Sequence, residues 1–267
     1  MDIEANGIRI NYTIEGEGPP IVLLHGYTLD RSFWDPQVRA LRRRYRVIVP
    51  DLRGFGAARD QVTEPDGTTM DLLADDLARL LDARGLDQVV LGGLSLGSYL
   101  AYAFLRRHPG RLGGLILFST TAAADTDETR AARMELAKRV EGDGIGVLPE
   151  AMLPRLLGPT SLEQRPELVE RVRALIVEQD PAGVVTAEHC LAARPDSFGD
   201  LGAVAVPTLV ISGAEDMVTG PDQGRAVASA IRDARFVLVE GAGHLVNLEQ
   251  PEQVNEALLN FIAPIWI

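Results

Sequence analysis

The 267-residue chain has little of several features that define other classes of protein. Its single cysteine, Cys190, excludes an intramolecular disulfide and any metal site built from several thiolates. We expect this residue to be a small buried apolar side chain. Basic residues are also scarce, with 26 Lys and Arg against 38 Asp and Glu and a net charge of −12. Because phosphate binding needs clustered Lys and Arg, this balance argues against a nucleic-acid partner.

Long apolar runs are missing as well. No stretch of roughly 18 apolar residues occurs, which predicts that no helix spans a membrane. Residues 1–6 carry neither the basic start nor the apolar core of a signal peptide, so the predicted location is the cytoplasm. The one local basic run, at residues 42–44, precedes an apolar segment and is interpreted as a solvated helix end.

What the chain does contain is an alternation of short apolar runs and amphipathic segments. Alternating apolar residues at 8, 10 and 12 predict a half-buried strand near a sheet edge. Continuous apolar runs predict strands buried on both faces of a mostly parallel sheet, at residues 21–24, 47–49, 89–91, 115–118 and 208–211. Helical spacing predicts helices over residues 70–81, 96–107 and 251–261. Such alternation predicts an α/β fold with right-handed crossovers.

The alternation breaks between about residues 120 and 199. Helical patterns at 130–140, 149–157 and 166–178 follow one another without a strand, and Gly and Pro residues punctuate them. The sequence therefore predicts an α/β core of residues 1–119 and 200–267, with a helical cap insertion at residues 120–199.

One serine motif stands between a predicted strand and a predicted helix. Residues 93–97 have the sequence Gly-Leu-Ser-Leu-Gly, which in this context is typical of a nucleophile elbow. The turn is so tight that side chains would crowd it, and Gly93 and Gly97 remove two of them. Ser95 is then exposed at a helix N-terminus, where unpaired N–H groups stabilise negative charge. The alternative is a helix N-cap, which leaves both glycines unexplained.

A serine hydroxyl needs a base within hydrogen-bond reach, and the chain has only four histidines. His108 ends a predicted helix, His189 lies in the insertion and His25 follows an early strand. His244 lies on a glycine-rich loop after an apolar strand, where α/β folds place catalytic groups. We therefore predict His244 as the general base, against the alternative of an exposed loop histidine.

The base needs a carboxylate to orient it, and the nucleophile needs an oxyanion hole. Glu215 and Asp216 both follow the strand at 208–211 and are the two candidates, unless they are solvated loop acids. Leu96 supplies one backbone N–H as the residue after the nucleophile, and Tyr27, beside Gly26, is the predicted second donor. His25 is then a structural loop histidine.

Together these motifs resemble the α/β-hydrolase superfamily. The resemblance extends to His25-Gly26, Val206-Pro207-Thr208, Gly243-His244 with Pro251-Glu252, and the segment Pro-Asp-Leu-Arg-Gly-Phe-Gly at residues 50–56. It implies an α/β-hydrolase fold, with a mostly parallel central sheet flanked by helices and a small helical cap inserted in the antepenultimate-to-penultimate strand region. It also favours Asp216 over Glu215 as the acid of a Ser95, Asp216 and His244 triad.

Within the superfamily, overall length and the segments Ser32-Phe33-Trp34 and Met152-Leu153-Pro154 are similar to serine esterases and 3-oxoadipate enol-lactonases with a helical cap. Serine at the elbow argues against dehalogenases and epoxide hydrolases, which carry Asp there, and against Cys-dependent dienelactone hydrolases. The resemblance implies hydrolysis of a small carboxylic ester or lactone through an acyl-enzyme, without cofactor or metal, by a monomer or homodimer.

The substrate pocket is the least determined part. Met152, Leu153, Leu157, Val218 and Leu245 are candidate lining residues, although the residues from the insertion would also suit helix-on-helix packing. The acidic excess of the insertion favours a neutral ester over an anionic lactone, an inference that one buried arginine would reverse. Two alternatives stay open: a carbon–carbon bond hydrolase or perhydrolase that uses the same triad, and a ligand-binding receptor on a hydrolase scaffold.

Overall fold

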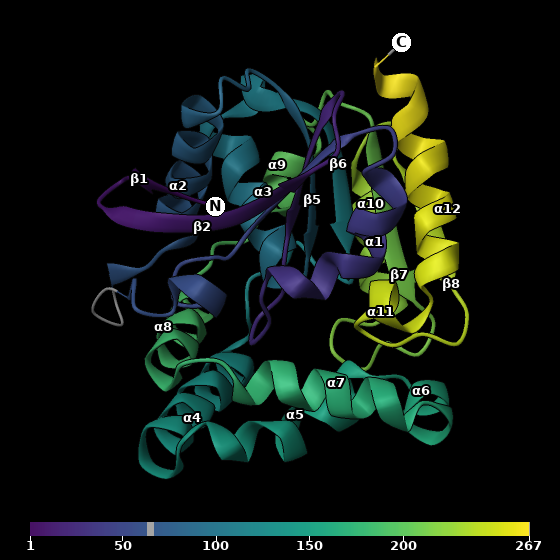
Figure 1. The fold of residues 1–267 in the computed structure, drawn as a ribbon. Coiled ribbons are helices and arrows are strands. Elements are labelled where there is room, and N and C mark those ends of the chain that lie inside the picture. Colours follow the sequence, from purple (N-terminus) through teal and green to yellow (C-terminus); the bar gives the residue numbers. More distant parts are fainter. Residues whose placement is uncertain (63–66, 267) are drawn as a thin grey trace.

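The structure, a computed structural model, describes residues 1–62 and 67–266, and in this part of the chain eight strands form one sheet (Figure 1). The strand order is β1-β2-β4-β3-β5-β6-β7-β8. The strands are β1 (Asp2–Ala5), β2 (Ile8–Glu15), β3 (Pro20–Leu24), β4 (Arg46–Pro50), β5 (Val89–Leu94), β6 (Leu112–Phe118), β7 (Thr208–Gly213) and β8 (Arg235–Val239).

All neighbouring strands from β4 to β8 in this order are parallel, whereas β2 is antiparallel to both β1 and β4. The predicted fold class is therefore confirmed. Strands β3, β5, β6 and β7 are buried almost throughout, as their continuous apolar runs predicted. Strand β1 was not predicted, because a four-residue edge strand with half-exposed side chains has too weak an apolar pattern.

Helices flank this sheet and join its strands. They are α1 (Asp35–Leu41), α2 (Met70–Ala83), α3 (Leu96–Arg107), α9 (Phe198–Leu201), α10 (Pro221–Ala230), α11 (Val246–Glu249) and α12 (Pro251–Ile262). The exposed arginines at residues 42–44 follow α1 directly, which confirms the solvated helix end. None of the helices formed by residues 1–62 and 67–266 has the length and apolarity needed to cross a membrane.

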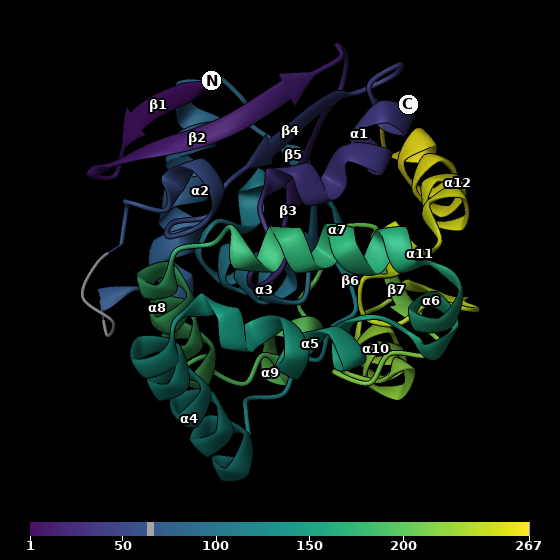
Figure 2. The ribbon, with the colours of Figure 1, turned by 60° about the horizontal axis from the view of Figure 1, so that its bottom comes forward.

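Five of the helices between β6 and β7 form what we call the helical layer: α4 (Asp127–Asp143), α5 (Leu148–Leu156), α6 (Pro159–Gln164), α7 (Pro166–Val177) and α8 (Pro181–Ala192). It lies across the carboxyl ends of the parallel strands, with α5 beside α7 and α4 beside α8 (Figures 1 and 2). The sequence did not predict α6 and α8, because Pro159 and Pro181 were interpreted as breaks. Each proline stands in a first helical turn, where its missing N–H costs nothing.

One buried ion pair holds the loop after β4 against α2. Both partners are nearly buried, and Arg53 donates two hydrogen bonds to Asp76, from Nε at 3.0 Å and from Nη2 at 2.8 Å. The substitution Arg53→Met leaves the Asp76 carboxylate buried without its cation. We therefore expect it to lower the free energy of unfolding by about 3–5 kcal/mol.

This expectation is measured by urea denaturation, with Arg79→Met as the control. Arg79 and Asp82 form a pair that is exposed on both sides, so the control is expected to change stability by less than about 0.5 kcal/mol. The double variant Arg53→Met/Asp76→Leu is expected to regain most of the loss, since it removes both charges. A single variant as stable as the wild type would contradict this account.

Candidate active site

Ser95 occupies a strained turn between β5 and α3. Its backbone has φ 53° and ψ −110°, a positive φ that costs a residue with a side chain on the order of 1–3 kcal/mol. A Cβ added at Gly93 would overlap the carbonyl oxygen of Gly97, and one at Gly97 would overlap the carbonyl oxygen of Leu24. The turn therefore requires both glycines. The Ser95 side chain makes no capping hydrogen bond, so helix capping does not explain the serine.

His244 and Asp216 meet in the buried loops after β8 and β7. The Nδ1 atom of His244 lies 2.9 Å from Oδ2 and 3.1 Å from Oδ1 of Asp216. A carboxylate can only accept, so this contact places the proton of the neutral imidazole on Nδ1 and leaves a lone pair on Nε2. That tautomer is the one required of a general base.

The Asp216 carboxylate is held by more than the histidine. Val218 donates its backbone N–H at 2.8 Å, and Thr219 donates its backbone N–H at 3.1 Å and its hydroxyl at 2.7 Å. Burial by itself would raise the pKa of Asp216, but attraction to His244 in its protonated form and the hydrogen bonds to the carboxylate outweigh this effect and hold the pKa well below its usual range. The acid therefore stays ionised at neutral pH.

Glu215, the rival acid, faces a different partner. Its carboxylate accepts the backbone N–H of Thr160 at 3.0 Å and also the Thr160 hydroxyl. Glu215 thus connects the loop after β7 to α6 of the helical layer. The geometry separates two neighbouring carboxylates that the residues alone left as alternatives.

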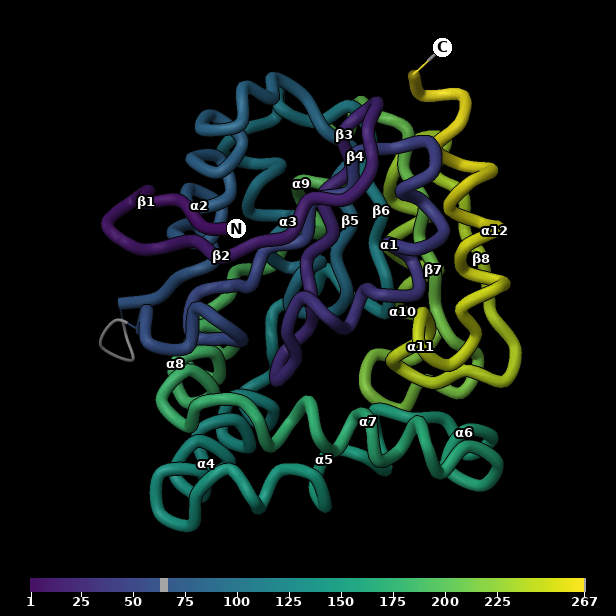
Figure 3. Tube along the Cα trace, in the orientation of Figure 1, coloured from purple at the N-terminus to yellow at the C-terminus, as the bar shows by residue number. Residues whose placement is uncertain are grey.

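The carboxyl ends of β5, β7 and β8 lie at the same edge of the parallel sheet (Figure 3). Ser95, Asp216 and His244 follow these three strands in the chain, which brings them to that edge. The charge of Asp216 also affects the pKa of Tyr99, which lies about one helical turn after Ser95. Burial chiefly raises the pKa of Tyr99 against the opposing charges of Arg194 and Arg133, and the negative charges of Asp125 and Asp216 add smaller rises. The acid is therefore within electrostatic reach of the first turn of α3.

The loop that carries Tyr27 runs against the serine turn. A Cβ at Gly26 would lie 3.0 Å from the side chain of Leu94, the residue before Ser95. Leu96, which directly follows Ser95 and begins α3, is buried as well. This adjacency suits two backbone donors that face one oxyanion. The donor roles of Tyr27 and Leu96 stay predictions.

Both ring nitrogens of His25 form hydrogen bonds with nearby backbone groups. Its Nε2 accepts the N–H of Leu52 at 2.9 Å, which leaves Nδ1 to donate to the carbonyl oxygen of Gly26 at 2.8 Å. Burial lowers the pKa of His25 against the smaller opposing effect of Asp51, so the ring stays neutral. This supports the structural role predicted from the sequence.

The candidate pocket residues divide into three groups. Met152 of α5 lies over the Tyr27 loop, with its sulfur 3.8 Å from the hydroxyl of Thr28. Leu153, Leu157 and Leu245 are buried in the hydrophobic core. Val218 is partly exposed. Their lining role stays a prediction.

Sequence reasoning missed a chain of buried charges under the helical layer. Arg133 donates to Asp125 at 2.6 Å and to Glu188 at 3.0 Å, and Arg194 contacts Asp125 at 2.6 Å. No spacing in the sequence links these residues, which come from α4, from α8 and from the loops beside them. The positive charges of both arginines are paired with carboxylates of the protein.

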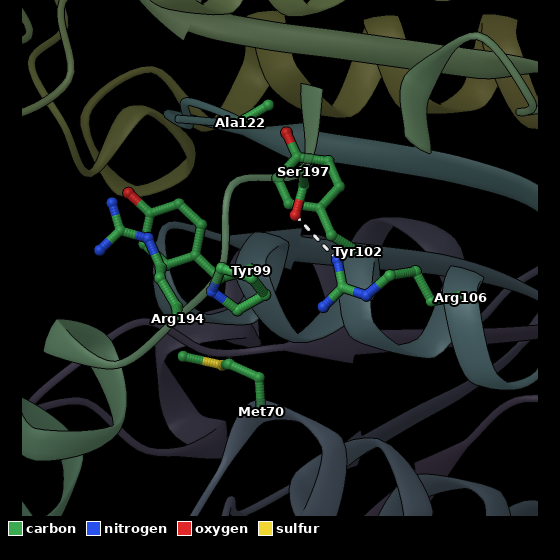
Figure 4. A pocket seen from close by; sticks show the side chains of 8 residues that line it. Met70, Tyr99, Tyr102, Arg106, Ala122, Arg194 and Ser197 are labelled. Carbon is green, nitrogen blue, oxygen red and sulfur yellow. Dashed lines mark hydrogen bonds between the residues drawn. The ribbon is translucent and has the colours of Figure 1, made fainter. Parts of the chain in front are cut away.

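A small cavity beside α3 extends this polar region (Figure 4). Arg194 stacks on the ring of Tyr99, 4.3 Å from its centroid, and Arg106 donates to the hydroxyl of Ser197 at 2.9 Å. These contacts tie the segment before α9 to α3. They support the helix that carries Ser95.

Comparison with known proteins decides the family. The model of the alpha/beta hydrolase fold family matches residues 19–251. The chain belongs to the α/β-hydrolase family. This α/β-hydrolase superimposes on a thermophilic esterase from Thermogutta terrifontis with a TM-score of 0.94 and 40% identity, covering 100% of this chain and 97% of that one.

Lactonases are similar over the whole length as well. The enol-lactonase from Burkholderia xenovorans has a TM-score of 0.90 and 30% identity, with 98% of this chain and 100% of that chain covered. The 3-oxoadipate enol-lactonase 1 of Acinetobacter baylyi is 28% identical, with 99% of this chain and 97% of the relative covered. The resemblance to this group is confirmed, and the chain is an enzyme of the hydrolase class.

Proposed function

We propose that this α/β-hydrolase cleaves a small carboxylic ester or lactone, with Ser95 as nucleophile, His244 as general base and Asp216 as the orienting acid. The observation that carries the proposal is the 2.9 Å contact between His244 Nδ1 and Asp216, at the sheet edge that holds the strained Ser95 turn. This contact supplies what a serine nucleophile lacks, a base with its lone pair available.

In the proposed mechanism, Nε2 of His244 takes the Ser95 proton while Oγ bonds to the substrate carbonyl carbon. The resulting oxyanion accepts the backbone N–H groups of Tyr27 and Leu96. The tetrahedral intermediate collapses as His244 protonates the leaving alkoxide, which yields an alcohol and an acyl-enzyme. Water then repeats these steps with His244 as base and releases the acid and the free Ser95. With a lactone, the alcohol stays attached to the acyl group.

A neutral substrate fits the charges of the site. The partly buried Arg133 and the buried Arg194 would favour an anion if they were free, but each is paired with carboxylates of the protein. Their charges are offset within the chain, so they do not reverse the preference for a neutral ester. The similar proteins include one that is named an esterase and two that are named enol-lactonases, which supports an ester or a lactone as the substrate class.

We further propose that the helical layer acts as the cap of the site, with residues 120–199 as the insertion and residues 1–119 and 200–267 as the core. Met152 above the Tyr27 loop supports this assignment. The same proposal includes the predicted pocket residues, a reaction without a cofactor, a location in the cytoplasm, and a monomer or homodimer.

The proposal is tested by labelling the wild type with a fluorophosphonate probe. We expect one adduct per chain by intact mass, located on Ser95 by peptide mapping, because only an activated serine reacts rapidly. A panel of aryl esters and γ-lactones should then be hydrolysed, and pretreatment with the probe should abolish this turnover. Labelling at another residue, with turnover intact, would contradict the proposal.

The same assays separate the alternatives. A vinylogous diketone that is cleaved faster than every ester would identify a carbon–carbon bond hydrolase. A folded wild type that neither reacts with the probe nor turns over any ester would favour a ligand-binding receptor on a hydrolase scaffold.

A further inference from the structure

Glu249 is a buried carboxylate that the proposed mechanism does not use. It ends α11 and is only 1% exposed. One of its oxygens accepts the backbone N–H of Gly243 at 2.9 Å, and the other accepts that of Gly158 at 2.8 Å. Gly243 directly precedes His244, and Gly158 precedes α6 of the helical layer. A single side chain therefore joins the histidine loop to the helical layer.

A second set of contacts joins the same two segments. The carbonyl oxygen of Leu156 accepts the N–H of His244 at 3.0 Å and that of Leu245 at 3.2 Å. Three consecutive amides, those of residues 243–245, are thus held either by the helical layer or by Glu249. The position of the histidine backbone therefore depends on the docking of the connection between α5 and α6.

This junction leaves no room for adjustment. A Cβ added at Gly158 would overlap the Glu215 carboxylate and would lie 2.9 Å from the nitrogen of Gly243. Burial raises the pKa of Glu249 more than the hydrogen bonds from Gly158, Gly243 and Ser161 lower it, so burial of this side chain carries a cost. Such a buried acid contributes little net stability, whereas its two hydrogen bonds fix the histidine loop and the start of α6 relative to each other.

We infer that Glu249 is a positioning residue, which sets the place of His244 relative to Ser95 and couples it to the docked helical layer. This inference rests on the proposed function, since it assigns a task only if His244 is the base. A base displaced by about 1 Å loses on the order of a hundredfold in rate, while substrate binding is little affected.

The test compares Glu249→Gln with Glu252→Gln, an exposed acid three residues later. In Glu249→Gln an amide NH2 replaces one acceptor and faces a backbone N–H. We expect kcat on an aryl ester, and the rate constant for fluorophosphonate labelling, to fall about tenfold to a hundredfold with KM within about threefold. The control is expected to match the wild type in all three quantities.

Labelling by the small probe separates positioning from a merely structural role. Loosening of the helical layer alone would raise KM for the ester and leave the labelling rate constant unchanged, and this result would overturn the inference. Unchanged kcat and labelling would overturn it as well.

Gly158→Ala is the second variant, because it disturbs the junction without altering Glu249 or the triad. Its backbone has φ −67°, which alanine adopts without strain. It is expected to lose kcat and labelling rate in the same proportion, and it decides the matter if Glu249→Gln does not fold by circular dichroism. A wild type that forms no Ser95 adduct would instead refute the proposed function itself.

Discussion

Ser95→Ala is expected to lower kcat on an ester that the wild type hydrolyses by about ten-thousandfold to a millionfold, with KM nearly unchanged. In the proposed mechanism the hydroxyl oxygen of Ser95 forms the acyl-enzyme, and alanine has no atom that can take its place. The residual rate should come from substrate binding and the oxyanion hole alone. Steady-state kinetics on a purified variant, with intact mass to exclude wild-type contamination, measures the effect.

The matched control is Ser229→Ala, which removes a serine hydroxyl from α10. That hydroxyl donates only to the carbonyl oxygen of Arg225 within its own helix. We expect its kcat and KM to equal those of the wild type. If Ser95→Ala kept the wild-type rate, hydrolysis through an acyl-enzyme at this serine would be wrong.

Asp216→Asn should have the second largest effect, a loss of about a thousandfold to ten-thousandfold in kcat. The asparagine fills the same space, and its carbonyl oxygen can still accept from Val218 or Thr219. Its NH2, however, faces Nδ1 of His244 and favours the tautomer with the proton on Nε2. That tautomer cannot take a proton from Ser95. Kinetics on the same ester, together with thermal unfolding, separates this effect from loss of the fold.

Glu215→Gln is the control beside it. Its oxygens accept from Thr160 of the helical layer and not from the histidine, so we expect a change in kcat below about tenfold. If Glu215→Gln lost as much activity as Asp216→Asn is expected to lose, while Asp216→Asn stayed active, the assignment of the acid would be reversed. The variant of each carboxylate is thus the control for the variant of the other.

The sheet was predictable where its strands are buried on both faces. The apolar runs at 21–24, 89–91 and 208–211 have no polar alternation, and β3, β5 and β7 contain them. The helix at 96–107 was predicted at the exact bounds of α3. Edge strand β1 and helices α6 and α8 were missed, since their short or proline-led segments carry weak local signals.

The candidate site was predictable in its residue types, because each candidate follows a predicted strand: β5 and β7 are buried, and β8 is partly exposed. Outside the predicted pair of Asp216 and His244, what could not be predicted is which distant side chains meet. Asp125 and Arg194 are 69 positions apart in the sequence, yet they form one ion pair. The Glu249 junction between the histidine loop and the helical layer likewise joins residues with no common motif.

By itself, the sequence predicted a mostly parallel sheet and a serine turn, and its motifs resembled the α/β-hydrolases, since patterns of glycines, apolar runs and one serine depend only on neighbours along the chain. Tertiary structure alone decided that Asp216 and not Glu215 meets His244, that the buried arginines are paired, and that Glu249 holds the histidine loop. These are contacts between distant segments, and their geometry arises only when the parallel strands bring their carboxyl ends to one edge.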